Sequence, residues 1–450
     1  MPPETMDIQS LRRAYAQGMR PSRVIHELLG RMEREDRAGV WISRFSAEQL
    51  MAMAYQLEKA SPDQLPLYGI PFAIKDNIDV QGLETTAACP AYAYRPECNA
   101  VVVEHLVKLG AIPIGKTNLD QFATGLNGTR SPYGVCRNFF NPDYIAGGSS
   151  SGSAVSVASQ WVSFSLGTDT AGSGRIPAAF NNLVGLKPSR GLISTRGVVP
   201  ACRTLDCVSL FAQNVEDVRW VFDRIVHFDP QDSFARTLPA PLPSFQKPLR
   251  IGVALSHQLQ FFGDHEYARL YEHACIRLGS AEVVIKEVDC SCLFEVASML
   301  YQGPWVVERY LIMQQLLHDH PEAILPVIRE VVATAGEQSA ADMFRALYRL
   351  QALKRRAECI WSEVDLMMMP TAGRIFRVEE VQSEPLARNT ELGYYTNFMN
   401  LLDYTAIAMP AGFKNDGLPF GVTFFAPAFR DTDLLDWASE WARMTKDSES

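Results

Sequence analysis

The sequence predicts an α/β protein built around a buried sheet, because short apolar runs alternate with amphipathic segments. Residues 70–74 are expected to form a short buried strand, residues 99–110 a helix that stops at Gly110, and residues 111–115 the next strand. The composition agrees, since 47% of the 450 residues are hydrophobic and 21% are charged, which is ordinary for a globular protein. The chain is long enough to bury a sizeable core.

The remaining elements follow from apolar spacing, prolines and turn residues. Helical spacing dominates residues 7–60 and 265–360, and small side chains at 153–166 suit a helix packed closely against a neighbour. Five prolines between Pro230 and Pro248 indicate a surface connection rather than a flexible linker. Strands are expected at residues 249–255 and 365–370 and after a turn at 414–419, and a closing helix at 431–444.

The charge and the cysteine content limit the partners and the compartment. The net charge is −9 with acidic and basic residues interspersed, so the sequence predicts no nucleic-acid or membrane partner, although one placed arginine could bind a small anion. The nine cysteines include no CxxC motif, and Cys290 and Cys292 alone are a weak metal signal. Without a signal peptide or an apolar run long enough to span a membrane, we expect a cytoplasmic protein with reduced thiols and no metal site.

Residues 144–175 carry the strongest chemical signal. Two clusters of Ser and Gly, at residues 147–153 and 167–175, contain no His, Cys or Glu. A flexible linker is disfavoured because apolar residues flank the stretch. A phosphate-binding loop is disfavoured because neither the GxxxxGK[ST] nor the GxGxxG order is present. Serines without a histidine need another base, which indicates a serine hydrolase that uses a lysine.

Lys75 and Ser173 are the candidate base and nucleophile. Lys75 follows the apolar run 70–74, so burial can lower its pKa from about 10.4 towards about 7, as a base at neutral pH requires. Ser173 lies among small residues, which lets backbone N–H groups converge on a developing oxyanion. Each has a structural alternative, because Lys75 could pair with Asp76 and Ser173 could belong to a tight turn. His105, the nearest histidine, lies in an amphipathic helix, where packing or exposure explains it better.

These motifs resemble the amidase signature family. The resemblance rests on residues 69–77, 115–118, 147–177 and 185–191, covers most of residues 65–225 and resumes at 397–422. It implies the amidase signature fold, a large mixed β-sheet core covered by helices on both faces. We therefore expect one amidase domain over residues 1–450, divided into an N-terminal helical region (1–62), a catalytic core (63–227), a connection (228–248) and the remainder of the sheet with a helical substrate-specificity region (249–450).

The family's Ser-Ser-Lys triad carries over to Ser173 as nucleophile, Ser149 as bridging serine and Lys75 as base. The resemblance also implies a cis peptide bond between Gly148 and Ser149. An acyl-enzyme would form on Ser173 and water would release it, without a cofactor or metal.

The residues around the nucleophile are expected to stabilise its reaction. The resemblance implies an oxyanion hole formed by the backbone N–H groups of Thr170, Ala171, Gly172 and Ser173. It also implies a supporting ion pair between Asp169 and Arg175, with a structural rather than a chemical role.

Residues 122–130, 301–309 and 394–400 are similar to the allophanate hydrolases of that family, which act on a small amide that bears a carboxylate. The resemblance implies that Arg309 pairs with the substrate carboxylate and that Tyr301 hydrogen-bonds it. Gly125 and Asn127 are expected to line the same pocket.

A helix break should bring the two main substrate residues together. Gly303 and Pro304 are expected to end one helix and start another, so that Tyr301 and Arg309 reach one pocket from either side. The alternative, from the residues alone, is that Arg309 pairs with Glu308 or a surface acid.

The resemblance predicts hydrolysis of the terminal amide of allophanate (urea-1-carboxylate) to ammonia and N-carboxycarbamate, in urea or s-triazine nitrogen catabolism. It implies a homodimer, and a chain that lacks the usual C-terminal domain, so that a separate or missing domain would act on the product. Two rival functions within the family are another small-amide amidase and the amidase subunit of a tRNA-dependent amidotransferase. A rival from another class is a non-catalytic binding module, which predicts the loss of a triad residue.

Overall fold

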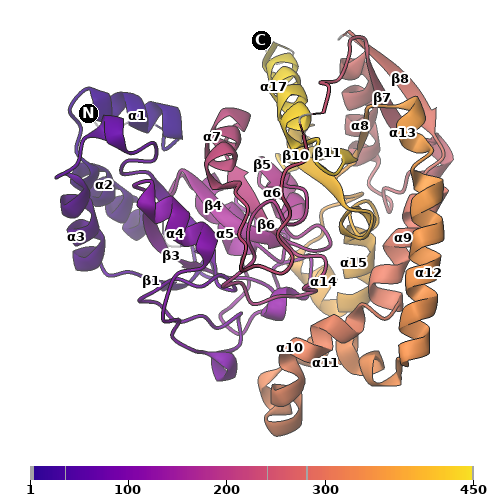
Figure 1. Ribbon diagram of the computed structural model, residues 1–450, viewed down its shortest axis with the longest axis horizontal. Coiled ribbons are helices and arrows are strands. Elements are labelled where there is room, and N and C mark those ends of the chain that lie inside the picture. The colour runs from indigo at the N-terminus through magenta and orange to yellow at the C-terminus, as the bar shows by residue number, and fades with distance from the viewer. Residues whose placement is uncertain (1–4, 36, 241, 280–281, 448–450) are drawn as a thin grey trace.

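The computed structural model describes residues 5–35, 37–240, 242–279 and 282–447, and a single 11-stranded sheet runs through this part of the chain (Figure 1). The strands are β1 (Trp41–Arg44), β2 (Pro71–Lys75), β3 (Ile112–Thr117), β4 (Phe164–Asp169), β5 (Val184–Lys187), β6 (Cys207–Ala212), β7 (Leu249–Ala254), β8 (Val283–Val288), β9 (Leu366–Pro370), β10 (Tyr404–Phe413) and β11 (Pro419–Pro427). Their order is β1-β3-β2-β4-β6-β5-β10-β11-β9-β7-β8. Pairing is parallel within β3-β2-β4 and within β9-β7-β8 and antiparallel elsewhere, so the sheet is mixed, as expected.

Seventeen α-helices surround the sheet in the described residues. They are α1 (Ile8–Ala16), α2 (Pro21–Arg34), α3 (Ala47–Leu57), α4 (Val101–Lys108), α5 (Ser151–Ala158), α6 (Arg175–Phe180), α7 (Val215–Ile225), α8 (His265–Leu278), α9 (Ser291–Gln302), α10 (Val306–Asp319), α11 (Pro326–Ala333), α12 (Ala340–Ala357), α13 (Ile360–Glu363), α14 (Val378–Ser383), α15 (Pro385–Leu392), α16 (Phe398–Leu401) and α17 (Asp431–Asp447). Side-chain caps start several of them: Ser46 forms a capping box at α3, and Asp264 caps α8. Among these helices, none is both long enough and apolar enough to cross a membrane.

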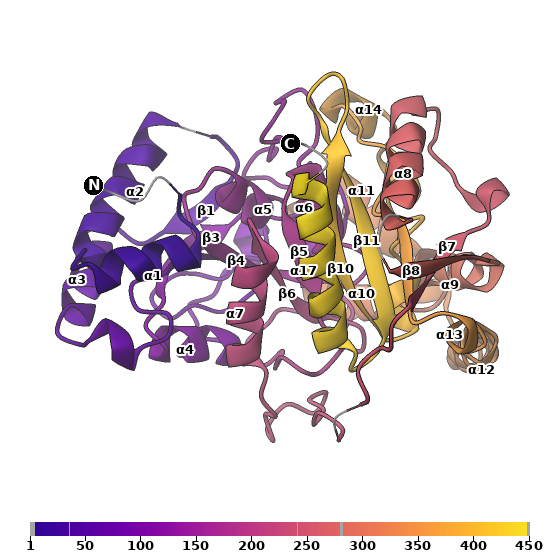
Figure 2. The same cartoon turned by 90° about the horizontal axis from the view of Figure 1, so that it is seen from above.

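Helices cover both faces of the sheet, and the side chains of β11 contact a helix on each face. Successive side chains of a strand point to opposite faces, so residues three apart face opposite sides. Gly421 lies so close to Ala179 of α6 that an added Cβ would come within 2.7 Å. Phe424 instead stacks edge-on against Trp437 and Trp441 of α17. α5 packs beside α6, and α7 packs beside α17, so each face carries a pair of helices (Figure 2).

The structure corrects three expected elements. The helical stretch 7–60 also contains the strand β1, which pairs antiparallel with β3. The helix expected at 153–166 is shorter, because α5 ends at Ala158, Gln160 takes a left-handed backbone with φ 52°, and the following apolar residues form β4. The mainly helical stretch 265–360 also contains β8, whose run of valine and isoleucine suits a strand better than a helix.

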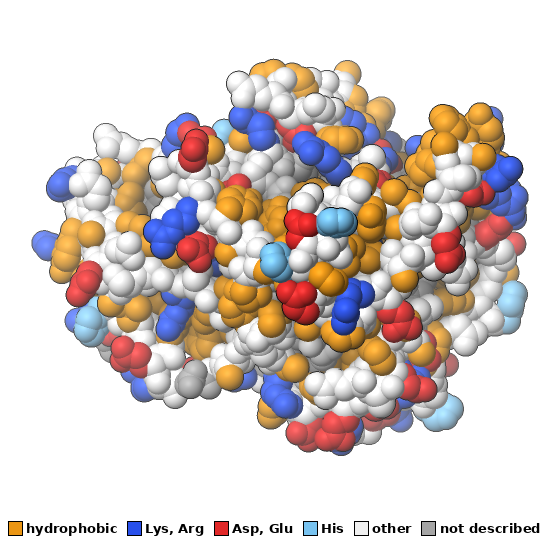
Figure 3. All heavy atoms as spheres, turned by 90° about the horizontal axis from the view of Figure 1, so that it is seen from below, with side chains coloured by type: hydrophobic (Ala, Val, Ile, Leu, Met, Phe, Trp, Pro, Cys, Tyr) orange, Lys and Arg blue, Asp and Glu red, His pale blue; other side chains and the backbone are white. Residues whose placement is uncertain are grey.

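The fold brings the signature motifs to one edge of the sheet. β2 pairs in parallel with β4, with Ile74 opposite Leu166, so the carboxyl ends of both strands open at the same edge. A separate cluster of α10 and α11, at the lower end of the molecule in Figure 1, packs onto Phe122 and Val199 near that edge. On the face seen from below, basic side chains are scattered among acidic and apolar ones (Figure 3).

Candidate active site

Lys75 ends β2 and is completely buried. Its Nζ atom lies 2.7 Å from Ser149 Oγ, 2.8 Å from Thr168 Oγ1 and 3.4 Å from the carbonyl oxygen of Thr168. The alternative pairing with Asp76 is wrong, because the Asp76 carboxylate lies 2.9 Å from Nζ of the buried Lys116 instead. Lys75 is therefore available to Ser149.

The surroundings of Lys75 favour its neutral form. Burial lowers the pKa of Lys75 to about 7, because the charged amine loses its hydration. The carboxylates of Asp120, Asp206 and Asp169 oppose this by attracting the charged form, and the positive charge of Arg309 reinforces it. A substantial fraction of Lys75 therefore carries a lone pair at neutral pH.

Ser149 lies two residues before the start of α5 and joins the lysine to the second serine cluster. The Gly148–Ser149 peptide bond is cis, as the family resemblance implied. Gly148 has no room for a side chain, because an added Cβ would come within 2.3 Å of the Asp120 carboxylate. The N–H of Ser150 donates to the carbonyl oxygen of Ser173 at 3.4 Å, so the two Ser/Gly clusters lie against each other.

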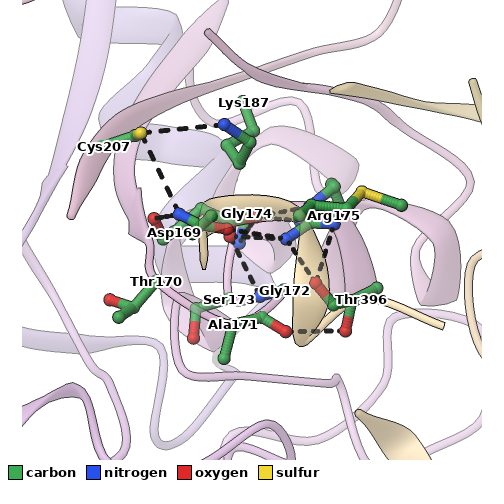
Figure 4. Close-up of polar contacts among 12 residues, drawn as sticks. Asp169, Thr170, Ala171, Gly172, Ser173, Gly174, Arg175, Lys187, Cys207 and Thr396 are labelled. Carbon is green, nitrogen blue, oxygen red and sulfur yellow. Dashed lines mark hydrogen bonds and ion pairs between the residues drawn. The ribbon is translucent and has the colours of Figure 1, made fainter. Parts of the chain in front are cut away.

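Ser173 lies in the turn between β4 and α6, and Asp169 fixes that turn (Figure 4). The Asp169 carboxylate accepts the N–H groups of Gly172 at 2.9 Å and Gly174 at 3.0 Å, and it forms a buried ion pair with Arg175 at 2.8 Å. Burial raises the pKa of Asp169, but Arg175 outweighs it and holds that pKa below its usual value. The expected ion pair is present and shapes the turn that carries Ser173.

The backbone around Ser173 also shows which N–H groups are engaged. Of the four N–H groups expected to bind an oxyanion, that of Gly172 donates to Asp169 at 2.9 Å instead. Gly172 has φ 128°, and an added Cβ would come within 2.4 Å of Thr396 Oγ1, so only glycine fits here.

Tyr301 and Arg309 meet across the expected helix break. α9 ends at Gln302 and α10 begins at Val306, on either side of Gly303 and Pro304. Arg309 Nη2 donates to the Tyr301 hydroxyl at 3.4 Å, and its guanidinium carbon lies 5.1 Å from the centre of the Tyr301 ring.

Arg309 is 1% exposed and makes no ion pair within the described part of the chain. The alternative pairing with Glu308 is wrong, because Glu308 accepts the N–H and the hydroxyl of Thr204 at 2.9 and 2.5 Å. Arg309 instead donates to the Ala123 carbonyl oxygen and the Thr124 hydroxyl, at 3.4 and 3.2 Å. An arginine stays protonated in proteins, so a buried positive charge faces this site. The carboxylates of Asp206 and Glu308 attract it, but no carboxylate of the described residues contacts it.

Gly125 and Asn127 belong to the same segment, but only Gly125 contacts the candidate nucleophile. The Ser173 hydroxyl donates to the Gly125 carbonyl oxygen at 3.4 Å, so Gly125 touches the candidate nucleophile. The Asn127 side chain is occupied internally: its Nδ2 donates to Asn389 Oδ1, and its Oδ1 accepts from Thr129. Asn127 shapes the segment through these contacts.

Three further residues organise the site without having been predicted. The Thr168 hydroxyl accepts from Lys75, Asp120 accepts the N–H groups of residues 127, 128 and 130, and Asp206 accepts the Thr170 hydroxyl at 2.5 Å. All three lie in or beside the signature motifs. The partners of Thr168 and Asp206 become neighbours only through the fold, so spacing along the chain carries no signal for these two. The partners of Asp120 follow it within ten residues, but no motif marks that loop.

The sheet and this site define a class of protein. A model of the amidase family matches residues 23–435, and the chain therefore belongs to the amidase family. It is 43% identical to urea amidolyase of Saccharomyces cerevisiae, over 89% of this chain and 22% of that protein. It superposes on allophanate hydrolase of Kluyveromyces lactis with a TM-score of 0.92 and 41% identity, covering 98% of this chain and 72% of that one.

A second group of relatives is more distant. A glutamyl-tRNA(Gln) amidotransferase subunit from Pseudomonas savastanoi pv. phaseolicola is 31% identical, over 88% of this chain and 87% of that protein. The chain spans 22% of the length of the curated urea amidolyases that it matches. The likeness to these relatives therefore covers one part of the larger enzymes and nearly the whole of the amidotransferase subunit.

Proposed function

We propose that this chain hydrolyses the terminal amide of allophanate, releasing ammonia and N-carboxycarbamate, in the use of urea or s-triazine nitrogen. The observation that carries the proposal is Arg309, a buried arginine without a carboxylate partner among the described residues. A buried charge of this kind calls for a partner, and a substrate carboxylate provides one. The likeness to Kluyveromyces lactis allophanate hydrolase supports the same substrate.

The size of the substrate follows from one short segment. Gly125 touches Ser173, while Ala123 and Thr124 touch Arg309. Two residues span at most about 7 Å, so the nucleophile and the arginine face a small space. In allophanate a single nitrogen separates the reacting carbonyl from the carboxylate, which suits this spacing.

The contacts of Lys75 suit a neutral amine. Its two N–H groups can donate to the hydroxyl and the carbonyl oxygen of Thr168, which leaves the lone pair for the Ser149 hydroxyl. Lys75 would then take a proton from Ser149 while Ser149 takes the proton of Ser173.

Ser173 Oγ attacks the amide carbonyl carbon, and the oxyanion that forms accepts hydrogen bonds from the N–H groups near Ala171. The carbon–nitrogen bond breaks as Ser149 returns a proton to the leaving ammonia. Water then attacks the acyl carbon and passes its proton through Ser149 to Lys75. The bond to Ser173 Oγ breaks as this proton returns through Ser149 to Ser173, and the product leaves with both serines and neutral Lys75 restored.

The pKa of Lys75 predicts the pH profile. Because the neutral amine is the active form and its pKa is about 7, we expect kcat/KM to rise with pH through about 7 and then level off. Well below that value, each pH unit should lower kcat/KM about tenfold. Rates of ammonia release between about pH 5 and about pH 9 measure this. A profile that is flat through neutrality would contradict a lysine base.

Arg309→Gln should separate charged from neutral amides. Malonamate keeps the spacing of allophanate with a CH₂ in place of the central nitrogen, and malonamide is its neutral counterpart. We expect the variant to raise KM for malonamate by about 100-fold, because a buried charge-assisted pair is lost. KM for malonamide should change by less than about threefold, as measured by ammonia release. Equal losses on both substrates would argue against a carboxylate partner for Arg309.

We also propose that the protein is cytoplasmic and forms a homodimer. The product of its reaction would pass to a separate domain or protein. All nine cysteines are free, including the exposed Cys98 and Cys359, which supports a reducing compartment. The homodimer is supported only by the family resemblance, and sedimentation of the purified chain measures it.

A further inference from the structure

Arg130 is a second buried arginine beside Arg309 that no part of the proposed mechanism uses. It is 3% exposed and, like Arg309, makes no ion pair within the described ranges. Its Nη1 donates to the Thr124 carbonyl oxygen at 3.0 Å and its Nη2 to the Pro385 carbonyl oxygen at 2.7 Å. Burying a guanidinium to hold two backbone carbonyls is costly, so the position of those carbonyls matters to the protein.

The segment 120–130 connects the nucleophile to the candidate anion site. Its Gly125 carbonyl oxygen meets Ser173, while Ala123 and Thr124 supply two of the three hydrogen-bond acceptors around Arg309 in the described structure. Within the segment, Asp120 accepts the N–H groups of residues 127, 128 and 130, but Phe122 and Ala123 both have φ 50°, a left-handed conformation that side chains disfavour. External contacts must hold it.

Two contacts with α15 supply that support. Arg130 joins Thr124 to Pro385, the first residue of α15. One turn further along, Asn389 accepts the N–H of Leu126 at 2.8 Å and the side-chain amide of Asn127 at 3.1 Å. The segment is thus fixed to α15 on both sides of Gly125.

We propose that Arg130 is a positioning residue for substrate specificity. Its two hydrogen bonds, to the carbonyl oxygens of Thr124 and Pro385, hold residues 123–125 in place. Arg309 then faces a substrate carboxylate that is separated by a single atom from the carbonyl group that Ser173 attacks. The inference rests on the proposed function, because it assumes an anionic amide. A lysine cannot replace this contact, since a single ammonium lacks the planar fork that reaches two separate carbonyls.

The nucleophile itself has independent support. Asp169, Arg175 and Thr396 hold the turn around Ser173 through bonds that do not involve the segment 120–130. Loss of Arg130 should therefore displace the acceptors of Arg309 more than it displaces the reacting serine. We therefore expect a higher KM for anionic amides and little change for neutral amides.

The test compares malonamate with malonamide in Arg130→Gln and Arg130→Lys. We expect both variants to raise KM for malonamate at least about tenfold and to change kcat/KM for malonamide less than about threefold. Calorimetric binding of malonamate to Ser173→Ala, with and without Arg130→Gln, should show the same loss without turnover. Arg250→Gln is the matched control, because Arg250 also fixes a loop by donating to Ser362 and Asp365, far along the sheet on β7.

The outcomes separate this inference from the proposed function. Equal losses on both amides, or wild-type KM in Arg130→Lys, would overturn the positioning role while leaving an Arg309 effect intact. If wild-type enzyme does not prefer malonamate and Arg309→Gln changes nothing, the proposed function fails and this inference fails with it. Should Arg130→Gln not fold, as judged by thermal unfolding, Asn389→Ala decides, since it frees the same segment and should show the same malonamate-selective loss.

Discussion

Ser173→Ala is expected to lower kcat at least about 10⁴-fold, the largest effect of any single substitution in this protein. The expected loss is large because the hydroxyl of Ser173 forms the acyl bond, and a methyl group offers no nucleophile. The variant should fold normally, since within the described residues the Ser173 side chain makes one long hydrogen bond, to Gly125 at 3.4 Å. Ammonia release under saturating malonamate measures the loss, and thermal unfolding checks the fold.

Ser163→Ala is the matched control for that experiment. Ser163 is also buried, directly before β4, and its hydroxyl has no hydrogen-bond partner among the described side chains and backbone. We expect its kcat to stay within about twofold of wild type. Turnover by Ser173→Ala above about one hundredth of the wild-type rate would mean that another group attacks the amide.

Lys75→Arg and Lys75→Met should both lower kcat about 10³- to 10⁴-fold. The pair distinguishes a base from a structural cation, because arginine keeps the positive charge and stays protonated at every assay pH. If Lys75 acts as a base, the kcat of Lys75→Arg should be no higher than the kcat of Lys75→Met. Steady-state ammonia release near pH 8, where wild-type Lys75 is mostly neutral, measures both variants.

Lys414→Met is the control for the lysine substitutions, because Lys414 pairs with Asp264 at 3.1 Å away from the site. Its kcat should stay within about twofold of wild type. A Lys75→Arg enzyme that keeps a tenth or more of wild-type turnover would mean that Lys75 serves through its charge and not as a base.

Two members of the candidate triad could be predicted from the sequence because each lies in a local motif. Lys75 ends an apolar run and Ser173 lies among small residues, and both features can be recognised without the fold. Ser149 needed the family resemblance, since nothing local distinguishes it from Ser150 or Ser151. The closing helix and β9 were predictable for the same reason, from a continuous pattern of apolar residues.

The support of the site could not be predicted because its partners are distant in sequence. Arg130 contacts Pro385, 255 residues away, and Arg309 contacts Thr124, 185 residues away. Such contacts depend on how α10 and α15 pack, which no short motif encodes. β8 was missed for a related reason: its strand character is set by pairing with β7 inside a helical stretch of sequence.

The most direct test of the central claim is the ratio of kcat/KM for allophanate to kcat/KM for glutamine and for acetamide, measured as ammonia release by the purified chain. The buried Arg309 predicts a ratio of at least about 100 in favour of allophanate, because neutral amides leave that charge unpaired. A kcat/KM for glutamine or acetamide that equals or exceeds the value for allophanate would contradict specificity for an anionic amide.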